Sequence, residues 1–171
     1  MAEPRLLTDR LELYPLPAAA AAALPHERET AARLLAATLA PAWPQIDLLD
    51  VLPVQAAAAP GDERFGVWVM LERETGTIVG DVGFMGPPQV DGSLELGYSV
   101  IPDRRRRGYA TEAAQAIVGW ALRQPGVTTA LAHCDRDNEA SVRTLERIGF
   151  ERTGKAEGQL AWRFGSHSGH Q

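Results

Sequence analysis

With 171 residues and a formal net charge of −5, the chain has the length of one domain and too little positive charge for general binding to nucleic-acid phosphates. Hydrophobic residues make up 45% and charged residues 23%, as in an average soluble domain. The mild acidity is compatible with a cationic partner such as an amine. Cys134 is the only cysteine, which excludes an internal disulfide and favours a reducing, cytoplasmic location.

No segment has the pattern of a signal peptide or a membrane span. The first residues open no apolar signal core. The longest apolar run, Ala18 to Leu24, is far shorter than the ~20 residues that a span needs. We therefore expect no membrane partner and a single domain over residues 1–171, with its core at about 5–165 and a loose tail at 166–171. The sequence leaves a homodimer possible.

The first third of the chain predicts one strand followed by helices. Polar and apolar residues alternate over 9–14, which is the strand period. Residues 17–40 are rich in Ala, Leu, Glu and Arg, which favour helix, and Pro25 should divide that helix in two. After a turn at 41–44, the apolar spacing predicts a further helical piece that ends near Pro60.

The remaining pattern predicts strands that enclose two helices. Gly108 precedes a helix whose apolar residues repeat at helical spacing, and Asn138 and Gly149 cap a second helix at its two ends. The strands are expected at 65–72, 77–84, 94–101, 127–134, 150–154 and 160–164. This order predicts an α+β fold: a mostly antiparallel sheet with one strand–helix–strand unit and helices on both faces.

The most informative segment is the arginine run at 104–107 between a strand and a helix. The first amides of a helix have no partners inside it and, with the helix dipole, they bind phosphate. Gly108 and Ala110 are small enough to let a pyrophosphate approach, and the arginines add charge. A solvated basic turn is the alternative, but the strand, glycine and amphipathic helix in succession favour an anion site. The chain contains neither a P-loop nor a Gly-x-Gly-x-x-Gly dinucleotide motif.

These residues resemble a known family. Residues 105–110 look like the Gln/Arg-x-x-Gly-x-Gly/Ala signature of the GCN5-related N-acetyltransferase (GNAT) family. Residues 138–150 are similar to the Asn-x-x-Ser … Leu-Glu-Lys-x-Gly-Phe form of its ribosomal-protein N-acetyltransferase branch. Residues 8–11, 95–98 and 108–113 match that branch too. The resemblance covers about residues 5 to 165 in the family's order.

The resemblance implies a splayed sheet with acetyl-coenzyme A (acetyl-CoA) as co-substrate. Pantetheine would lie between the strands that end at Ile101 and Cys134, and backbone around Ser99 to Ile101 would pair with it and polarise the thioester carbonyl. The resemblance assigns these residues to the acetyl-CoA site: Ser99, Val100, Ile101, Arg105, Arg106, Arg107, Gly108, Tyr109, Ala110 and Asn138.

Two proton transfers need residues of their own. Many family members protonate the departing thiolate with a Tyr seven residues after the Asn, but here that position is Leu145. Ser141 is the substitute that the branch suggests, although Asn138 and Ser141 also fit a simple N-terminal cap. Glu95 on the central strand is the candidate base for the amine. Strand alternation puts Glu95 on the face that carries Gly97 and Ser99.

Other polar residues are assigned with less specific signals. His133 beside Cys134 can titrate near neutral pH or simply pack in its strand. Residues 133–135 are consecutive on a strand, so no metal site is expected. Trp43 lies in the segment that forms the acceptor wall in the family, where it either shapes the substrate pocket or fills the core.

The sequence therefore predicts an enzyme that moves acetyl from acetyl-CoA to a primary amine by direct attack in a ternary complex. The acceptor can be a protein N-terminus, an amino acid, a polyamine or another small amine. The alternative is an acyl-CoA-binding sensor without turnover, which Leu145 in place of Tyr favours.

Overall fold

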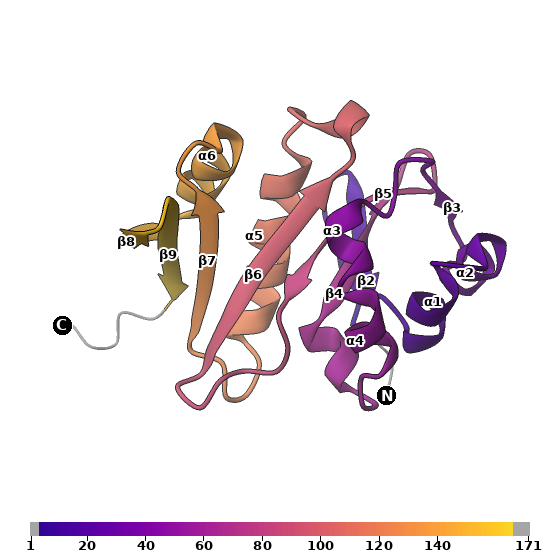
Figure 1. Cartoon of the computed structure of the whole chain (residues 1–171), viewed down its shortest axis with the longest axis horizontal. Coiled ribbons are helices and arrows are strands. Elements are labelled where there is room, and N and C mark those ends of the chain that lie inside the picture. The colour runs from indigo at the N-terminus through magenta and orange to yellow at the C-terminus, as the bar shows by residue number, and fades with distance from the viewer. Residues whose placement is uncertain (1–3, 166–171) are drawn as a thin grey trace.

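The computed structural model describes residues 4–165 and has an α+β architecture (Figure 1). Within these residues one sheet contains β1 Leu6–Leu7, β2 Leu11–Pro15, β3 Thr38–Leu39, β4 Val67–Glu72, β5 Thr77–Phe84, β6 Ser93–Val100, β7 Thr129–Asp135, β8 Glu151–Ala156 and β9 Gln159–Gly165. The α-helices are α1 Ala18–Ala23, α2 Arg28–Leu35, α3 Ile46–Leu49, α4 Leu52–Ala56, α5 Tyr109–Leu122 and α6 Glu139–Ile148. Single 3₁₀ turns cover Asp62–Phe65 and Pro102–Arg104.

The sheet is mostly antiparallel, as predicted. Its strand order is β1-β2-β4-β5-β6-β7-β9-β8, and β3 adds to β5. The two parallel pairs in the described part of the chain are β6 with β7 and β3 with β5. The β6–α5–β7 segment is therefore the expected strand–helix–strand unit, because two parallel neighbours need a crossover connection.

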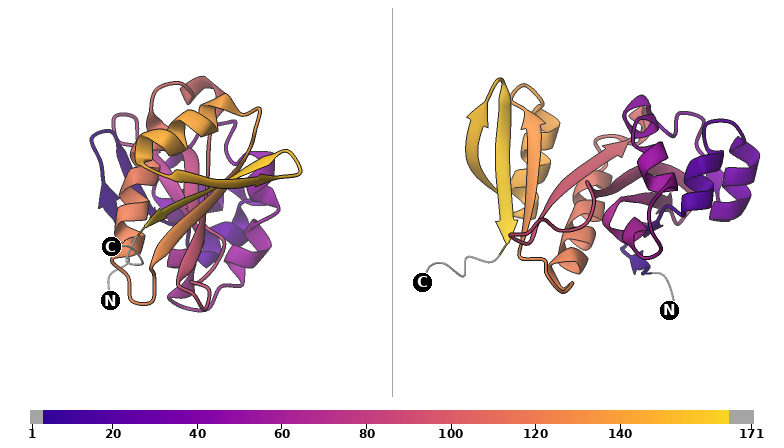
Figure 2. Two further views of the ribbon diagram at one scale, coloured as in Figure 1. Left: turned by 90° about the vertical axis from the view of Figure 1, so that its left-hand side faces the viewer. Right: turned by 60° about the horizontal axis from the view of Figure 1, so that its bottom comes forward.

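Strands β6 and β7 separate after a short ladder. The paired residues run from Ser93 with Thr129 to Leu96 with Ala132, although β6 continues to Val100 and β7 to Asp135. Figure 1 shows the two strands diverging towards the end where α5 begins, and the right-hand view of Figure 2 shows β7, β8 and β9 standing apart from β6. We call this divergence of β6 and β7 beyond Leu96 and Ala132 the wedge.

Helices cover both faces. Helix α5 packs against β2, β5, β6 and β7 on one face, and α1 to α4 lie on the opposite face of the first strands (Figures 1 and 2). Of the apolar positions predicted for α5, Ala113, Ala114, Ile117 and Ala121 are buried and Ala110 is partly buried. Burying this stripe fixes the start of α5 against the end of β6, since a helix buries its apolar face against the sheet.

Three local predictions were wrong. The helix predicted to reach Ala40 ends at Leu35, because Ala36 adopts a left-handed conformation (φ 54°) and the chain then forms β3. Strand β1 was not predicted, and Phe65 belongs to a 3₁₀ turn before β4. The loose tail predicted at 166–171 lies outside the described residues, and the single-domain assignment stays a prediction. No helix within residues 4–165 is long and apolar enough to cross a membrane.

Candidate functional site

A pocket of about 670 Å³ lies where β6 ends, α5 begins and α6 passes nearby. It is lined by residues 98–100 of β6, 104–106 and 108–111 of the loop and α5, 138, 140, 141, 143, 144 and 147 of α6 and its cap, and Asp47 of α3. The walls of the pocket therefore come from the end of β6, the loop and start of α5, and α6 with its cap.

Unpaired backbone donors gather at the start of α5. The first hydrogen bond inside the helix joins the Glu112 N–H to the Gly108 carbonyl at 3.0 Å. Among residues 4–165, the backbone N–H groups of 106 to 111 have no acceptor. Such amides at a helix N-terminus form an anion site, and those of Gly108, Tyr109, Ala110 and Thr111 belong to residues that line the pocket.

Gly108 shapes this loop through its backbone. It is the N-cap of α5 with φ 83°, a left-handed conformation that favours glycine. A Cβ at this position would also lie 3.3 Å from Nη2 of Arg10. The prediction that a side chain at 108 disturbs the loop therefore has a geometric basis.

The arginines have different surroundings. Arg105 donates through Nε to the Val100 carbonyl at 2.9 Å and through Nη2 to Oε1 of Gln45 at 2.9 Å. Arg106 is exposed and lines the pocket, whereas Arg107 is exposed but lies outside the lining. Two pocket-lining arginines of α6, Arg143 and Arg147, escaped the sequence analysis. Their spacing of four residues puts them on one helix face, a signal that was available.

The loop is anchored by Glu72 at the end of β4. The carboxylate accepts from Nε of Arg104 at 2.8 Å and from the Tyr109 hydroxyl at 2.7 Å. Glu72 is buried, and the Arg104 hydrogen bond is the main cause that lowers its pKa to about 2, against the opposing effect of burial. The Tyr109 side chain therefore holds the loop, and its predicted role in binding co-substrate falls to its backbone N–H.

Backbone groups at the end of β6 are partly used by the protein. The Ile101 N–H donates to the Val79 carbonyl at 2.9 Å, and the Ile101 carbonyl accepts from Arg104. Ile101 also lies outside the pocket lining, so its predicted backbone contact with pantetheine does not fit this geometry. Ser99 and Val100 do line the pocket. Gln45 donates to the Ser99 hydroxyl at 2.5 Å and to the Val100 carbonyl at 3.1 Å, which ties α3 to this strand end.

Helix α6 begins with the predicted cap. Oδ1 of Asn138 accepts from the Ser141 backbone N–H at 3.1 Å. The Ser141 side chain nevertheless lines the pocket, so the cap does not prevent a contact with substrate. Leu145 is 1% exposed and takes no part in the lining, which leaves the usual acid position of the resembled family filled with hydrocarbon.

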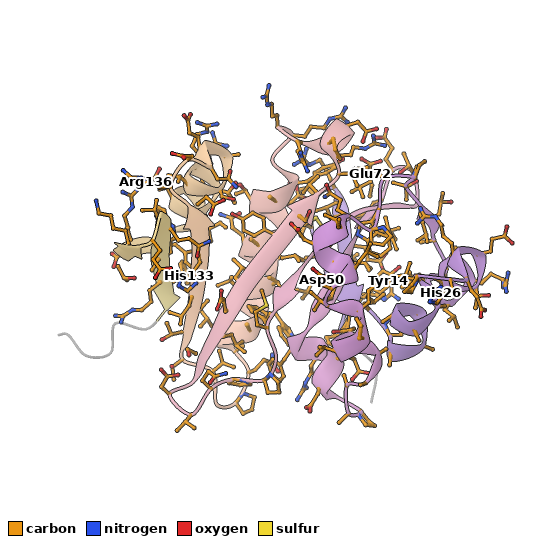
Figure 3. All side chains as sticks on the ribbon, in the orientation of Figure 1. Tyr14, His26, Asp50, Glu72, His133 and Arg136 are labelled. Atoms are coloured by element: carbon orange, nitrogen blue, oxygen red, sulfur yellow. The ribbon has the colours of Figure 1, made fainter. Side chains whose placement is uncertain are left out.

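Glu95 lies on the face of β6 that strand alternation predicted. Its neighbours Leu94 and Leu96 are buried, while Glu95 has a side chain that is 41% exposed. Oε2 of Glu95 lies 3.1 Å from Nδ1 of His133, on the neighbouring strand. The pair sits where the β6–β7 ladder ends, and Figure 3 shows His133 on β7 and Glu72 on the other side of β6. Glu95 does not line the pocket, so the two features occupy separate places.

Trp43 belongs to the core. It has no exposed surface, and its indole Nε1–H donates to Oδ2 of Asp81 at 2.9 Å. Burial is the main cause that raises the pKa of Asp81 to about 7; the Trp43 hydrogen bond opposes this rise, and the nearby Asp47 adds to it. Asp81 pairs with Ser99 in the β5–β6 ladder. The position of Trp43 agrees with the core alternative, and its role in shaping the substrate pocket stays a prediction.

No cluster of three or more His, Cys, Asp or Glu residues suited to a metal ion occurs within the described part of the chain. The sequence analysis missed Gln45, Asp81 and Glu72, since each acts through a partner distant in sequence. Without the fold, no local signal distinguishes these residues from ordinary polar ones.

Comparison with known sequences identifies a family. Residues 10–151 match the family model described as an acetyltransferase (GNAT) domain. Two relatives from Bacillus subtilis are the uncharacterised N-acetyltransferases YjdG, 35% identical over 111 residues, and YoaA, 33% identical over 102 residues. The matched stretches cover 63% and 59% of this chain, and 66% and 58% of the relatives. The chain therefore aligns with less than two thirds of either relative.

Solved structures share the fold over nearly the whole chain. An acetyltransferase from Agrobacterium tumefaciens has a TM-score of 0.66 at 25% identity and covers 97% of this chain and 96% of its own. A ribosomal-protein-S5-alanine acetyltransferase from Vibrio fischeri has a TM-score of 0.68 at 14% identity, with 99% and 100% covered. The resemblance drawn from the sequence motifs and the fold predicted from it are confirmed.

Proposed function

The chain belongs to the GNAT acetyltransferase family, and on this premise we propose that it transfers the acetyl group of acetyl-CoA to a primary amine. The observation that carries the proposal is the row of amides at residues 106 to 111, which have no acceptor among residues 4–165 and lie beside a pocket lined by arginines. Acetyl-CoA supplies an activated acyl group as a thioester and two linked phosphates for this site to bind.

The pocket residues fit such a co-substrate. Backbone donors of Arg106, Gly108 and Ala110 suit a pyrophosphate, since helix N-termini bind phosphate oxygens. Arg105, Arg106, Arg143 and Arg147 add cationic charge around the same space, and Asn138 lies at its edge. Ser99 and Val100 extend the lining along β6 towards the wedge, in the direction that the pantetheine arm would follow.

The reaction also needs a group that removes a proton from the amine, and Glu95 is the candidate for this step. A protonated amine cannot attack a carbonyl carbon, and the reference pKa of a lysine amine is about 10.4. Glu95 and His133 are both exposed, lie 3.1 Å apart and offer acceptor atoms next to the wedge. We infer that Glu95 takes the proton directly or through water, with His133 as its partner.

The attack is proposed to be direct, with both substrates bound together. The pocket and the Glu95–His133 pair occupy separate places, so a bound co-substrate leaves the pair free for an amine. Ser141 lines the pocket and is proposed to stabilise the departing thiolate. The single cysteine supports a cytoplasmic location as part of the same proposal.

A panel of amines with acetyl-CoA and a thiol-reactive dye tests the proposal. Peptides with free N-termini, amino acids, polyamines and aminoglycosides are each incubated with protein, and released thiol is followed over time. We expect amine-dependent release with at least one class. Calorimetric binding of acetyl-CoA without release by any class would instead favour the acyl-CoA sensor, for which the buried Leu145 is the supporting observation. Protein that neither binds nor turns over acetyl-CoA would contradict both functions.

A further inference from the structure

Two tyrosines line the pocket, Tyr98 and Tyr109, and the Tyr109 hydroxyl is held by Glu72. Of the three tyrosines in the chain, Tyr14 donates its hydroxyl to the Leu35 carbonyl and Tyr109 donates to Glu72. Tyr98 extends from β6 into the pocket instead, across from α6. It stands on the part of β6 that lies beyond the ladder with β7, which ends at Leu96 and Ala132. Tyr98 therefore occupies the wedge itself.

The Tyr98 hydroxyl meets the polar face of α6. It lies close to the hydroxyls of Ser141 and Thr144, and both of these residues also line the pocket. The Cys134 side chain on β7 is the further titratable group that acts on it. Three hydroxyl groups from two elements thus converge at the point where the pantetheine end of a bound co-substrate is expected.

Burial keeps this phenol protonated. Burial is the main cause that raises the pKa of Tyr98 above its usual value of 10.0, and the nearby hydroxyls of Ser141 and Thr144 act to lower it. At neutral pH the group therefore has a proton to give. A phenol, with a reference pKa of about 10, is close in acidity to a thiol at about 8.5, and burial raises the basicity of a thiolate for the same reason.

We propose that Tyr98 is a catalytic acid of the acetyl transfer and takes the place of the phenol that Leu145 removes from α6. The proposal rests on the proposed function. The amine nitrogen forms a bond to the acetyl carbon, the carbon–sulfur bond breaks with its electron pair on sulfur, and the sulfur receives the Tyr98 proton. Ser141 and Thr144 position the phenol and return a proton to it from solvent. The nitrogen loses two protons between ammonium and amide, one before the attack and one after it, and both pass through the Glu95 side to solvent. Tyr98 regains one proton from solvent, so the reaction releases one proton overall and the charge balances.

Turnover of Tyr98→Phe is the first test, because this change removes one oxygen and keeps the ring. We expect kcat to fall by about 100-fold or more, the usual range for loss of a general acid, while KM for acetyl-CoA changes by less than about twofold. Tyr14→Phe makes the same chemical change in the core and serves as the matched control, with normal kcat in the folded protein. An unchanged kcat in Tyr98→Phe, together with a fall in Ser141→Ala, would assign the proton to Ser141 and overturn the proposal.

Binding of the thiol product gives a second readout that does not depend on turnover. Calorimetry compares coenzyme A with desulfo-coenzyme A, which lacks the sulfur, for wild type and Tyr98→Phe at rising pH. We expect wild type to prefer coenzyme A increasingly as the thiolate forms, and Tyr98→Phe to lose that preference. An equal loss of affinity for both ligands would make Tyr98 a packing residue and contradict the proposal. Wild type that binds neither ligand would refute the proposed function itself, which separates the two failures.

Discussion

Carboxylates have different partners in two regions: the loop at residues 104–108, and the acceptor side of the sheet, which carries Asp81 and Glu95 and is proposed to meet the amine. At the loop, Glu72 is paired with the Arg104 guanidinium and the Tyr109 hydroxyl, and its pKa is lowered to about 2. On the acceptor side, Asp81 has the neutral indole of Trp43 as its hydrogen-bond donor, and burial raises its pKa to about 7. The hydrogen bond from Arg104 is the largest cause of the pKa shift at Glu72, whereas burial is the largest cause at Asp81, which has no charged donor among its stated causes.

The difference suits the two substrates of opposite charge that the proposed function requires. Because Arg104 neutralises Glu72, the remaining arginines and amides dominate the loop and favour an anion. Because Glu95 and Asp81 form no ion pair with an arginine or lysine within residues 4–165, that side can accept protons or attract a cationic amine. Four predictions test this separation, from the largest expected effect to the smallest.

Gly108→Val should abolish the binding of acetyl-CoA at the loop. A β-branched residue at φ 83° is strained, and its Cβ would lie 3.3 Å from Arg10, so the amides of the loop would turn away from the phosphate position. We expect no measurable binding of acetyl-CoA by calorimetry in the folded variant. Arg105→Ala and Arg107→Ala should weaken binding less, because the amides remain.

The matched control is Gly119→Ala in the same helix. A Cβ at Gly119 lies 3.8 Å from Arg123, an ordinary contact, so this variant should bind acetyl-CoA normally and gain about 0.5–1 kcal/mol of stability. A folded Gly108→Val protein that binds as tightly as Gly119→Ala would contradict the anion site.

Asp81→Asn should change how stability depends on pH. Between the ordinary value of 3.8 and the folded value of about 7, the folded protein binds a proton that the unfolded chain has lost. The free energy of unfolding therefore falls as pH rises through this range, by about 4 kcal/mol at 1.36 kcal/mol per unit. Asp81→Asn should remove that fall, as measured by urea unfolding at pH 4 to 8. Parallel curves for wild type and variant would show that Asp81 does not titrate there.

Glu95→Gln should impair catalysis on the acceptor side. The change is nearly isosteric and removes the proton acceptor beside His133. We expect the rate at neutral pH to fall by about 100-fold or more, with acetyl-CoA affinity almost unchanged and partial recovery at high pH, where the free amine is abundant. Glu151→Gln, the same change on an exposed strand position, is the control and should react normally. Equal pH–rate profiles for wild type and Glu95→Gln would remove Glu95 from the mechanism.

Glu72→Gln should give the opposite pH effect from Asp81→Asn. The folded pKa of Glu72 lies below its ordinary value of 4.5, so its contribution is present above that value and is lost as pH falls towards 2. We expect the variant to be less stable at neutral pH by about 2 kcal/mol, the cost of losing a charged hydrogen bond. The difference from wild type should shrink between pH 5 and 2, as measured by urea unfolding. A constant difference over that range would show that the ion pair is not its source.

Local signals in the sequence predicted much of this arrangement. Gly108, Asn138 and Gly149 have conformations that depend on their own backbone, and the structure gives each the expected cap geometry. The alternation along β6 also predicted correctly that Glu95 lies on the partly exposed face, because successive side chains of a strand point to opposite faces. The prediction that the second helix reaches Ala40 was wrong because Ala36 adopts a left-handed conformation, and an alanine in the sequence does not indicate such a helix end.

The partners within the site were beyond local signals. Glu72 meets Arg104 across 32 positions of sequence, and Trp43 meets Asp81 across 38. Tyr98 and Ser141 line one pocket only because the end of β6 and the start of α6 both border it. These contacts arise from sheet order and helix packing. Both depend on the whole fold, so no short stretch of the sequence predicts them.

Because the ladder between β6 and β7 is short, the wedge is a boundary between two parts of the sheet that few strand pairings join. This boundary is called the seam below. The part that carries β7, β8, β9 and α6 is held to the remaining strands by the ladder of Ser93–Leu96 with Thr129–Ala132 and by contacts of α5. A ligand that contacts both walls of the wedge adds binding energy across that seam, and so raises the free energy of separating the two parts. Hydrogen exchange in β7 and β9 should therefore slow on binding more than exchange in β2 and β4, so that occupancy is reported by the distant strands.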